Sequence, residues 1–162
     1  MKIDAPLLAA QPFLKGLSKS QLEVLANNAM LVEFLPGRLI FEEGLEAHRF
    51  YLILEGTIAL ESSNANGGSD LVQTIKAGDV LGWSWLFPPY LWNFDARAVE
   101  PTKAIIFFAP TLRELCESDH HLGYEMLKRV AQVVISRLQS SRVQALKRAK
   151  KNVKAAATPP KD

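Results

Sequence analysis

The sequence contains a single cysteine, Cys116, so an internal disulfide cannot form. A chain without disulfides is typical of a reducing compartment, which predicts a cytoplasmic location. No apolar run approaches the roughly 18 residues needed to span a membrane, and residues 7–10 are too short for the apolar core of a signal peptide. With 162 residues the chain can form one domain with its own core.

The signatures of common enzyme classes are also missing. There is no phosphate-binding loop, redox cysteine pair or dinucleotide fingerprint. Ser84 follows a predicted strand, but residues 82–86 lack the second glycine of the hydrolase nucleophile elbow. Three carboxylates, those of Glu42, Glu43 and Glu46, lie in a predicted turn, where charge is normally solvated. We therefore expect no enzymatic activity and no catalytic residues.

A metal site is equally unsupported by the pattern of ligand residues. Cys116 and His120 are four positions apart and could share a helix face, with Asp119 and His121 beside them. Zinc requires three or four ligands in characteristic pairs, and none of the usual pairs is present. The favoured interpretation is a small buried cysteine and a surface histidine pair, with no metal and no tightly held cofactor.

Acidic residues are almost absent from the last part of the chain. Residues 1–125 carry 9 Lys+Arg and 16 Asp+Glu, a charge of −7, whereas residues 126–162 carry 10 Lys+Arg and one acid, a charge of +9, within a net charge of +2. A basic end of this kind binds nucleic acid, an acidic partner or a membrane surface in some proteins, and is a solvated helix end in others. Both interpretations stay open here.

What the sequence does contain is a series of short strands separated by turns. Residues 12–29 predict a helix, with Ser18 and Gln21 placed as a capping box. Strands are expected at residues 31–35, 39–41, 50–54, 57–61, 71–75, 94–99 and 103–108. Turns at intervals of roughly 8–12 residues predict a sandwich or barrel rather than a parallel sheet.

One stretch, residues 78–98, concentrates the aromatic residues. It holds all three tryptophans, Trp83, Trp85 and Trp92, and no lysine or arginine lies between positions 76 and 97. The prolines at 88 and 89 prevent a regular helix or central strand. An aromatic loop held between strands is a favourable place for a ligand or partner. The alternative is that the tryptophans cap a small barrel.

The chain is expected to end in a long helix. Thr111 is the predicted cap of a short helix, and residues 120–152 then form a helical pattern with neither proline nor, after Gly123, glycine. Apolar and small residues recur in alternating steps of three and four, which is the pattern of a coiled-coil seam over about three heptads. We expect a parallel homodimer through this seam: Tyr124, Leu127, Ala131, Val134, Leu138, Ser141 and Ala145.

Several glycine-containing turns follow an order that resembles a known family. They are Pro36-Gly37, Ile40-Phe41-Glu42-Glu43-Gly44, the segment from Phe50 to Gly56, and Gly78-Asp79-Val80-Leu81-Gly82. Over residues 12–145 the chain is similar to the cyclic nucleotide-binding domain of the catabolite activator family. The resemblance implies a mainly β protein with flanking helices: an antiparallel β-roll (a jelly-roll-like double-stranded β-helix) with N-terminal helices and a long C-terminal helix. The expected parts are residues 1–118, the roll; 119–152, the dimerisation helix; and 153–162, a disordered basic tail.

The resemblance also implies a phosphate-binding cassette after Gly82. In the family a glutamate holds the ribose hydroxyl there and an arginine pairs with the cyclic phosphate. Alignment on the strand around Arg97 places Trp83 at the glutamate position and Trp92 at the arginine position. The candidate ligand pocket is lined by Gly82, Trp83, Ser84, Trp85, Trp92, Asn93 and Phe94.

These departures predict a regulatory or sensor domain with altered or lost cAMP binding. A small-molecule effector remains a possible partner, as a cyclic nucleotide or another flat ligand. The alternative is an adaptor protein with a plugged pocket that acts through its dimer helix and basic tail. The regulators of this family continue into a helix-turn-helix, and this chain has no room for one after the long helix, so we expect a stand-alone domain without sequence-specific nucleic-acid binding.

Overall fold

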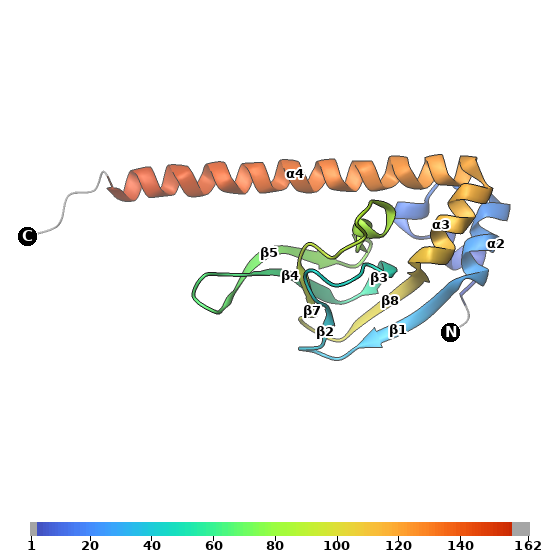
Figure 1. The fold of residues 1–162 in the computed structure, drawn as a ribbon, viewed down its shortest axis with the longest axis horizontal. Coiled ribbons are helices and arrows are strands. Elements are labelled where there is room, and N and C mark those ends of the chain that lie inside the picture. The colour runs from blue at the N-terminus through green and yellow to red at the C-terminus, as the bar shows by residue number, and fades with distance from the viewer. Residues whose placement is uncertain (1–2, 157–162) are drawn as a thin grey trace, which may run out of the picture. The chain divides into compact units, whose positions relative to one another are not determined.

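The computed structural model describes residues 3–156, and three short helices begin the fold (Figure 1). They are α1 (Ala5–Ala9), the 3-10 helix η1 (Pro12–Leu14) and α2 (Lys19–Asn27). The predicted capping box is confirmed, since the Ser18 hydroxyl accepts from the Gln21 N–H and the Gln21 side chain accepts from the Ser18 N–H. Helix α1 was not predicted, and it begins with the Asp4 carboxylate accepting from the Leu7 N–H at 2.9 Å.

The described residues form two four-stranded antiparallel sheets, which confirms the predicted β-roll (Figure 1). One sheet has the order β1-β8-β3-β6 and the other β2-β7-β4-β5. The strands are β1 (Ala29–Phe34), β2 (Leu39–Phe41), β3 (Arg49–Glu55), β4 (Thr57–Ser63), β5 (Ser69–Lys76), β6 (Val80–Leu81), β7 (Asp95–Ala98) and β8 (Thr102–Phe108).

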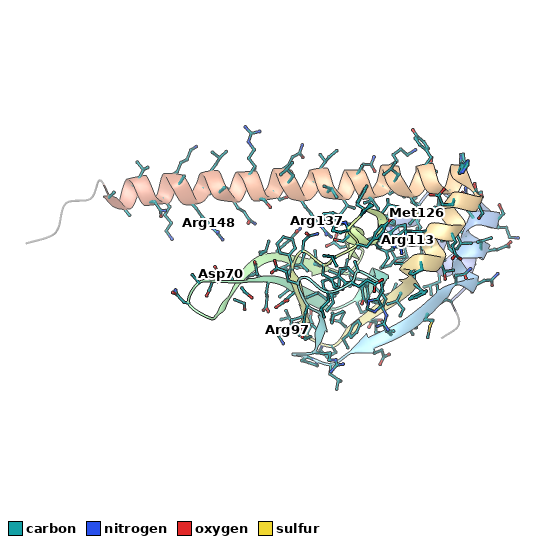
Figure 2. The ribbon with its side chains drawn as sticks, viewed as in Figure 1. Asp70, Arg97, Arg113, Met126, Arg137 and Arg148 are labelled. Atoms are coloured by element: carbon teal, nitrogen blue, oxygen red, sulfur yellow. The ribbon has the colours of Figure 1, made fainter. Side chains whose placement is uncertain are left out.

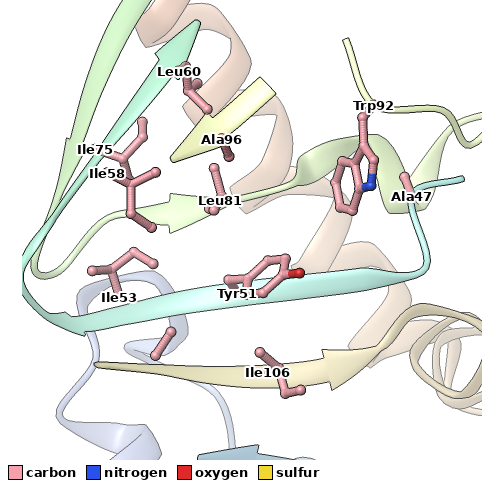
Figure 3. Close-up of a cluster of buried hydrophobic side chains, with 11 residues drawn as sticks. Ala47, Tyr51, Ile53, Ile58, Leu60, Ile75, Leu81, Trp92, Ala96 and Ile106 are labelled. Atoms are coloured by element: carbon pink, nitrogen blue, oxygen red, sulfur yellow. The ribbon is translucent and has the colours of Figure 1, made fainter. Parts of the chain in front are cut away.

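The interior of the roll is filled by side chains from both sheets (Figure 3). Tyr51 and Ile53 of β3 meet Ile58 of β4, Ile75 of β5 and Leu81 of β6 in one buried cluster. Isoleucine is the commonest large residue of this cluster, because β-branched residues pack well on a pleated surface. The cluster reaches one end of the roll at Trp92, where the candidate site lies.

Two helices follow the last strand. Helix α3 (Ala109–Ser118) begins two residues before Thr111, so the predicted cap at Thr111 is wrong. The cap residue is Phe108, and Pro110 lies in the first turn, where a missing N–H costs nothing. Asp119 separates this helix from the next one, which begins at His120. There the Asp119 carboxylate accepts from the Leu122 N–H at 3.0 Å, which holds the pKa of Asp119 below its ordinary value.

Helix α4 (His120–Ala156) is continuous to the last described residue. The part of the predicted tail at 157–162 lies outside the described residues. The chain divides into two compact units, residues 1–126 and 127–162, and α4 contributes to both. Within residues 3–156, no helix is both long enough and apolar enough to cross a membrane.

Candidate ligand pocket

The aromatic stretch runs through a short strand, a glycine, one helical turn, a proline loop and a strand. After β6, Gly82 adopts a left-handed conformation with φ +87° and starts the 3-10 helix η2 (Trp83–Leu86). A Cβ atom at Gly82 would lie 2.7 Å from the Trp92 ring. The glycine therefore provides both the turn and the space for the indole.

The end of the stretch is held by main-chain hydrogen bonds to the loop between β2 and β3. The Trp92 N–H donates to the Leu45 carbonyl at 2.8 Å, and the Trp92 carbonyl accepts from the Gly44 N–H at 2.9 Å. The Ala47 N–H donates to the Tyr90 carbonyl. These bonds fix the position of Trp92 independently of its side chain.

The Trp92 side chain lies inside the roll, with 3% of its surface exposed. Its ring stacks on Phe41, with centroids 3.8 Å apart and planes 9° apart, and lies 6.4 Å from the Tyr51 ring. Figure 3 shows the indole projecting toward Tyr51 and Leu81. An indole therefore fills the interior at the position where the resemblance places the phosphate-binding arginine.

A pocket of about 420 Å³ lies beside this indole. Four of the seven predicted residues, Trp83, Ser84, Trp92 and Asn93, line it, and the Asn93 amide donates to the Ser84 hydroxyl at 2.9 Å. The rings of Trp83 and Phe87 meet edge to face, 6.4 Å apart. The volume of the pocket is within the usual range for small-molecule sites.

Three predicted residues are not among those lining the pocket. Trp85 is fully buried, with its ring 5.7 Å from that of Phe50 and no hydrogen-bond partner for its indole nitrogen. Phe94 packs against the core cluster. Gly82 lies behind the Trp92 ring. Trp83 and Trp85 lie on one 3-10 turn, where nearby side chains face different directions, so a prediction that takes the stretch as a whole cannot separate the lining residues from the buried ones.

Six lining residues were missed: Glu43, Gly44, Phe87, Pro88, Pro89 and Leu91. Four of them belong to the aromatic stretch itself. Glu43 and Gly44 come from the loop between β2 and β3. The sequence predicts only a turn with solvated carboxylates there. The Asp95 carboxylate fixes this loop by accepting from the Glu43 N–H at 2.7 Å.

The pocket is lined without lysine or arginine. Arg97 lies on β7, as predicted, and its guanidinium contacts Glu61 at 3.3 Å and the Gly37 carbonyl at 3.1 Å. Burial raises the pKa of the Tyr51 hydroxyl above its ordinary value. Arg49, which hydrogen-bonds the Tyr51 side chain, acts in the opposite direction but does not cancel this effect. The one charged residue among those lining the pocket is Glu43.

Arg113 of α3 connects the aromatic stretch to the helices. Its guanidinium donates to the Trp85 carbonyl at 2.7 Å and lies 4.2 Å above the centre of the Tyr90 ring. A charge-assisted hydrogen bond combined with a cation–π contact is a strong link for a partly exposed side chain. Arg113, which Figure 2 labels, thus joins α3 to both η2 and the proline loop.

The region around Cys116 has the properties of packed structure. Burial, with help from the nearby carboxylates of Glu117 and Asp119, raises the pKa of the Cys116 thiol to about 11. A thiol with that pKa is largely protonated near neutrality and is a poor metal ligand or nucleophile. Among residues 3–156 no group of three or more His, Cys, Asp or Glu side chains is placed to hold a metal ion.

The seven residues of the predicted seam lie on α4. Tyr124, Leu127 and Leu138 are exposed, with 62%, 46% and 69% of their surfaces accessible. Ser141 and Ala145 are also exposed, and Ala131 and Val134 are partly so. All seven residues therefore lie on one continuous helix, and their role as a dimer seam stays a prediction.

Comparison with known proteins agrees with this architecture. A model of the cyclic nucleotide-binding domain family matches residues 31–119. A structure from Geobacter metallireducens GS-15, named as a candidate cyclic nucleotide-binding protein, is 30% identical with a TM-score of 0.77 and covers 84% of this chain and 98% of its own.

Two further relatives are larger proteins. A CRP-like cAMP-activated global transcriptional regulator of Mycobacterium tuberculosis is 22% identical over 125 residues, which are 77% of this chain and 56% of that regulator. The regulatory subunit of a cAMP-independent protein kinase A from Trypanosoma brucei is 26% identical with a TM-score of 0.64, over 77% of this chain and 44% of its own. This chain therefore spans about half the length of each. The match over residues 31–119, on a β-roll with a cassette between β6 and β7, shows that the chain belongs to the cyclic nucleotide-binding domain family.

Proposed function

We propose that this regulatory domain of the cyclic nucleotide-binding type has lost ordinary cAMP binding and senses a flat ligand without phosphate charge. The observation that carries the proposal is the burial of Trp92 against Phe41 and Gly82, at the position where the resemblance places the arginine. A phosphate taken out of water needs a fixed counter-charge. The residues around the pocket supply a carboxylate instead.

The expected loss of cyclic nucleotide affinity is large. Each charge-assisted hydrogen bond contributes about 1.5–3 kcal/mol, so removing the arginine alone weakens binding at least about tenfold. Trp83 also occupies the position of the glutamate that would accept the ribose hydroxyl. The T. brucei relative is described as cAMP-independent, which supports the view that this fold operates without cAMP in some proteins.

The remaining lining residues indicate the kind of ligand. Trp83 and Phe87 provide apolar walls for a ring system, while Ser84, Asn93 and Glu43 provide hydrogen-bonding groups. An uncharged nucleoside combines those properties, because it has a planar base and hydroxyl donors but no phosphate. Adenosine is therefore a suitable probe, since it differs from cAMP only in the cyclic phosphate.

Tryptophan fluorescence tests the proposal, because Trp83 is the tryptophan of the three that is not fully buried. We expect adenosine to change the emission and to protect Trp83 from acrylamide, with an affinity at least about tenfold tighter than that of cAMP. The Trp83→Phe variant should lose the signal, and the Trp85→Phe variant should keep it. Tighter binding of cAMP than of adenosine would contradict the charge argument.

The alternative function is an adaptor whose pocket is plugged, and the depth of Trp92 in the core favours it. A plugged pocket leaves all emission unchanged by adenosine and cAMP alike, in the wild type and in both variants. That result would remove the sensing role and leave α4 as the functional surface. In either case we propose no catalysis.

The output is proposed to pass through a parallel homodimer formed by the seam of α4. Sedimentation velocity should give twice the 18.0 kDa chain mass for the wild type. The Leu138→Asp variant should sediment as a monomer, because a carboxylate in the seam would be buried without a partner. Leu138 is exposed in the single chain, so the change leaves the monomer fold intact. A Gln139→Asp control, one position off the seam, should remain dimeric; an unchanged mass for Leu138→Asp would contradict the seam.

A further inference from the structure

The second half of α4 is a continuous basic surface. From residue 127 to residue 156 the helix carries nine Lys+Arg and no Asp or Glu. Six of the nine fall between residues 142 and 154, which we call the basic segment: Arg142, Lys147, Arg148, Lys150, Lys151 and Lys154. Every residue from 141 to 156 is exposed, and Figure 2 shows Arg148 extending from the helix.

The four lysines of the basic segment are separated from the apolar seam around the helix. At 100° per residue, Lys147, Lys151 and Lys154 lie on neighbouring ridges. Ala145, the last seam residue, lies on the opposite side from this group. A dimer formed through the seam would therefore leave the lysines facing outward, as a row about 10 Å long from Lys147 to Lys154.

We propose that the basic segment binds the phosphate backbone of nucleic acid, without reading its sequence. The charge complementarity is direct, because duplex DNA carries about one negative charge per 1.7 Å and the segment offers six cations along about 18 Å of helix. Contacts from lysine to phosphate position a protein on a duplex but do not select bases. The proposal concerns residues 142–154 and is independent of what the pocket binds.

Two other polyanionic partners fit less well. Helices that lie on membranes pair basic residues with bulky apolar and aromatic anchors, and the sequence after Tyr124 contains no tryptophan, tyrosine or phenylalanine. The apolar residues within the basic segment are small or aliphatic: Val143, Ala145, Leu146, Ala149 and Val153. An acidic protein would need a matching run of carboxylates along about 18 Å of helix, whereas any duplex carries phosphate charge along that whole length.

The test measures fluorescence anisotropy of a labelled duplex of random sequence against the full-length chain. For about five phosphate contacts, the affinity should fall about 500-fold between roughly 50 and 200 mM salt. The triple variant Lys147→Gln, Lys150→Gln, Lys151→Gln should weaken binding at least tenfold and reduce the salt slope by about 2.7. Glutamine keeps the helix propensity, so the helix should persist by circular dichroism.

A matched control carries the same change of net charge on the other unit. The variant Lys19→Gln, Lys76→Gln, Lys103→Gln also lowers the formal net charge from +2 to −1, and it should bind the duplex as the wild type does. Equal loss in both variants would show that net charge alone matters and would overturn the proposal. So would wild-type binding to vesicles of phosphatidylserine and phosphatidylcholine without binding to the duplex.

Discussion

Replacing Trp92 with alanine is expected to lower the free energy of unfolding by about 3–5 kcal/mol. The indole is almost fully buried, stacks on Phe41 and touches Gly82, and it closes one end of the core cluster. Its removal deletes that packing and leaves a void between the two sheets, which the main-chain bonds to the loop between β2 and β3 hold open. Urea unfolding followed by far-UV circular dichroism measures the loss without relying on tryptophan emission.

Trp83→Ala is the matched control for this substitution. Trp83 is only partly buried and meets Phe87 edge to face beside the pocket, so its removal should change stability by about 1 kcal/mol or less. A loss of similar size in both variants would mean that Trp92 does not fill the core in solution. The wild-type pocket would then be larger than about 420 Å³, with space for a phosphate group.

Gly82→Ala is expected to destabilise the domain by about 2–5 kcal/mol, for two separable reasons. With φ at +87°, any residue with a Cβ is strained there. The added methyl group would also lie 2.7 and 2.9 Å from two carbons of the Trp92 ring and 3.1 Å from the Arg49 carbonyl oxygen. Thermal and urea unfolding of the variant would give the total.

A second glycine and a double variant separate the two reasons. Gly37 has φ +80° but nothing within 4 Å of an added Cβ, so Gly37→Ala should show the conformational loss alone, about 1–2 kcal/mol. The steric part at Gly82 should disappear when Trp92 is alanine. The double variant should therefore be less destabilised than the sum of the single variants, and strict additivity would argue against contact between Gly82 and Trp92.

The strands and turns were predictable because their signals are local. Alternation and turn residues located β2 at Leu39–Phe41 and β8 within one residue of its observed start. The capping box at Ser18 fixed the start of α2 for the same reason. Helix α1 was missed because five residues give too short a period to recognise, although Asp4 followed by Pro6 is the signal that marks its start.

The pocket was predictable only in part, since it is assembled from distant segments. Trp83 and Asn93 were found because they lie in the aromatic stretch, whereas Glu43 reaches the pocket from a loop roughly 40 residues earlier. The burial of Trp85 could not be read from the stretch, because it depends on Phe50 of β3. The hydrogen bond from Arg113 to the Trp85 carbonyl could not be predicted either, because it joins residues 28 positions apart.

We propose above that the pocket excludes a cyclic phosphate. Calorimetric titration of the wild-type chain with cAMP tests this exclusion most directly. We expect no binding tighter than about 1 mM, because the residues lining the pocket offer Glu43 and no cation. Micromolar binding of cAMP would contradict it. If the Arg49→Gln variant then lost that binding, the guanidinium beside Tyr51 would be identified as a counter-charge that substitutes for the arginine missing at position 92.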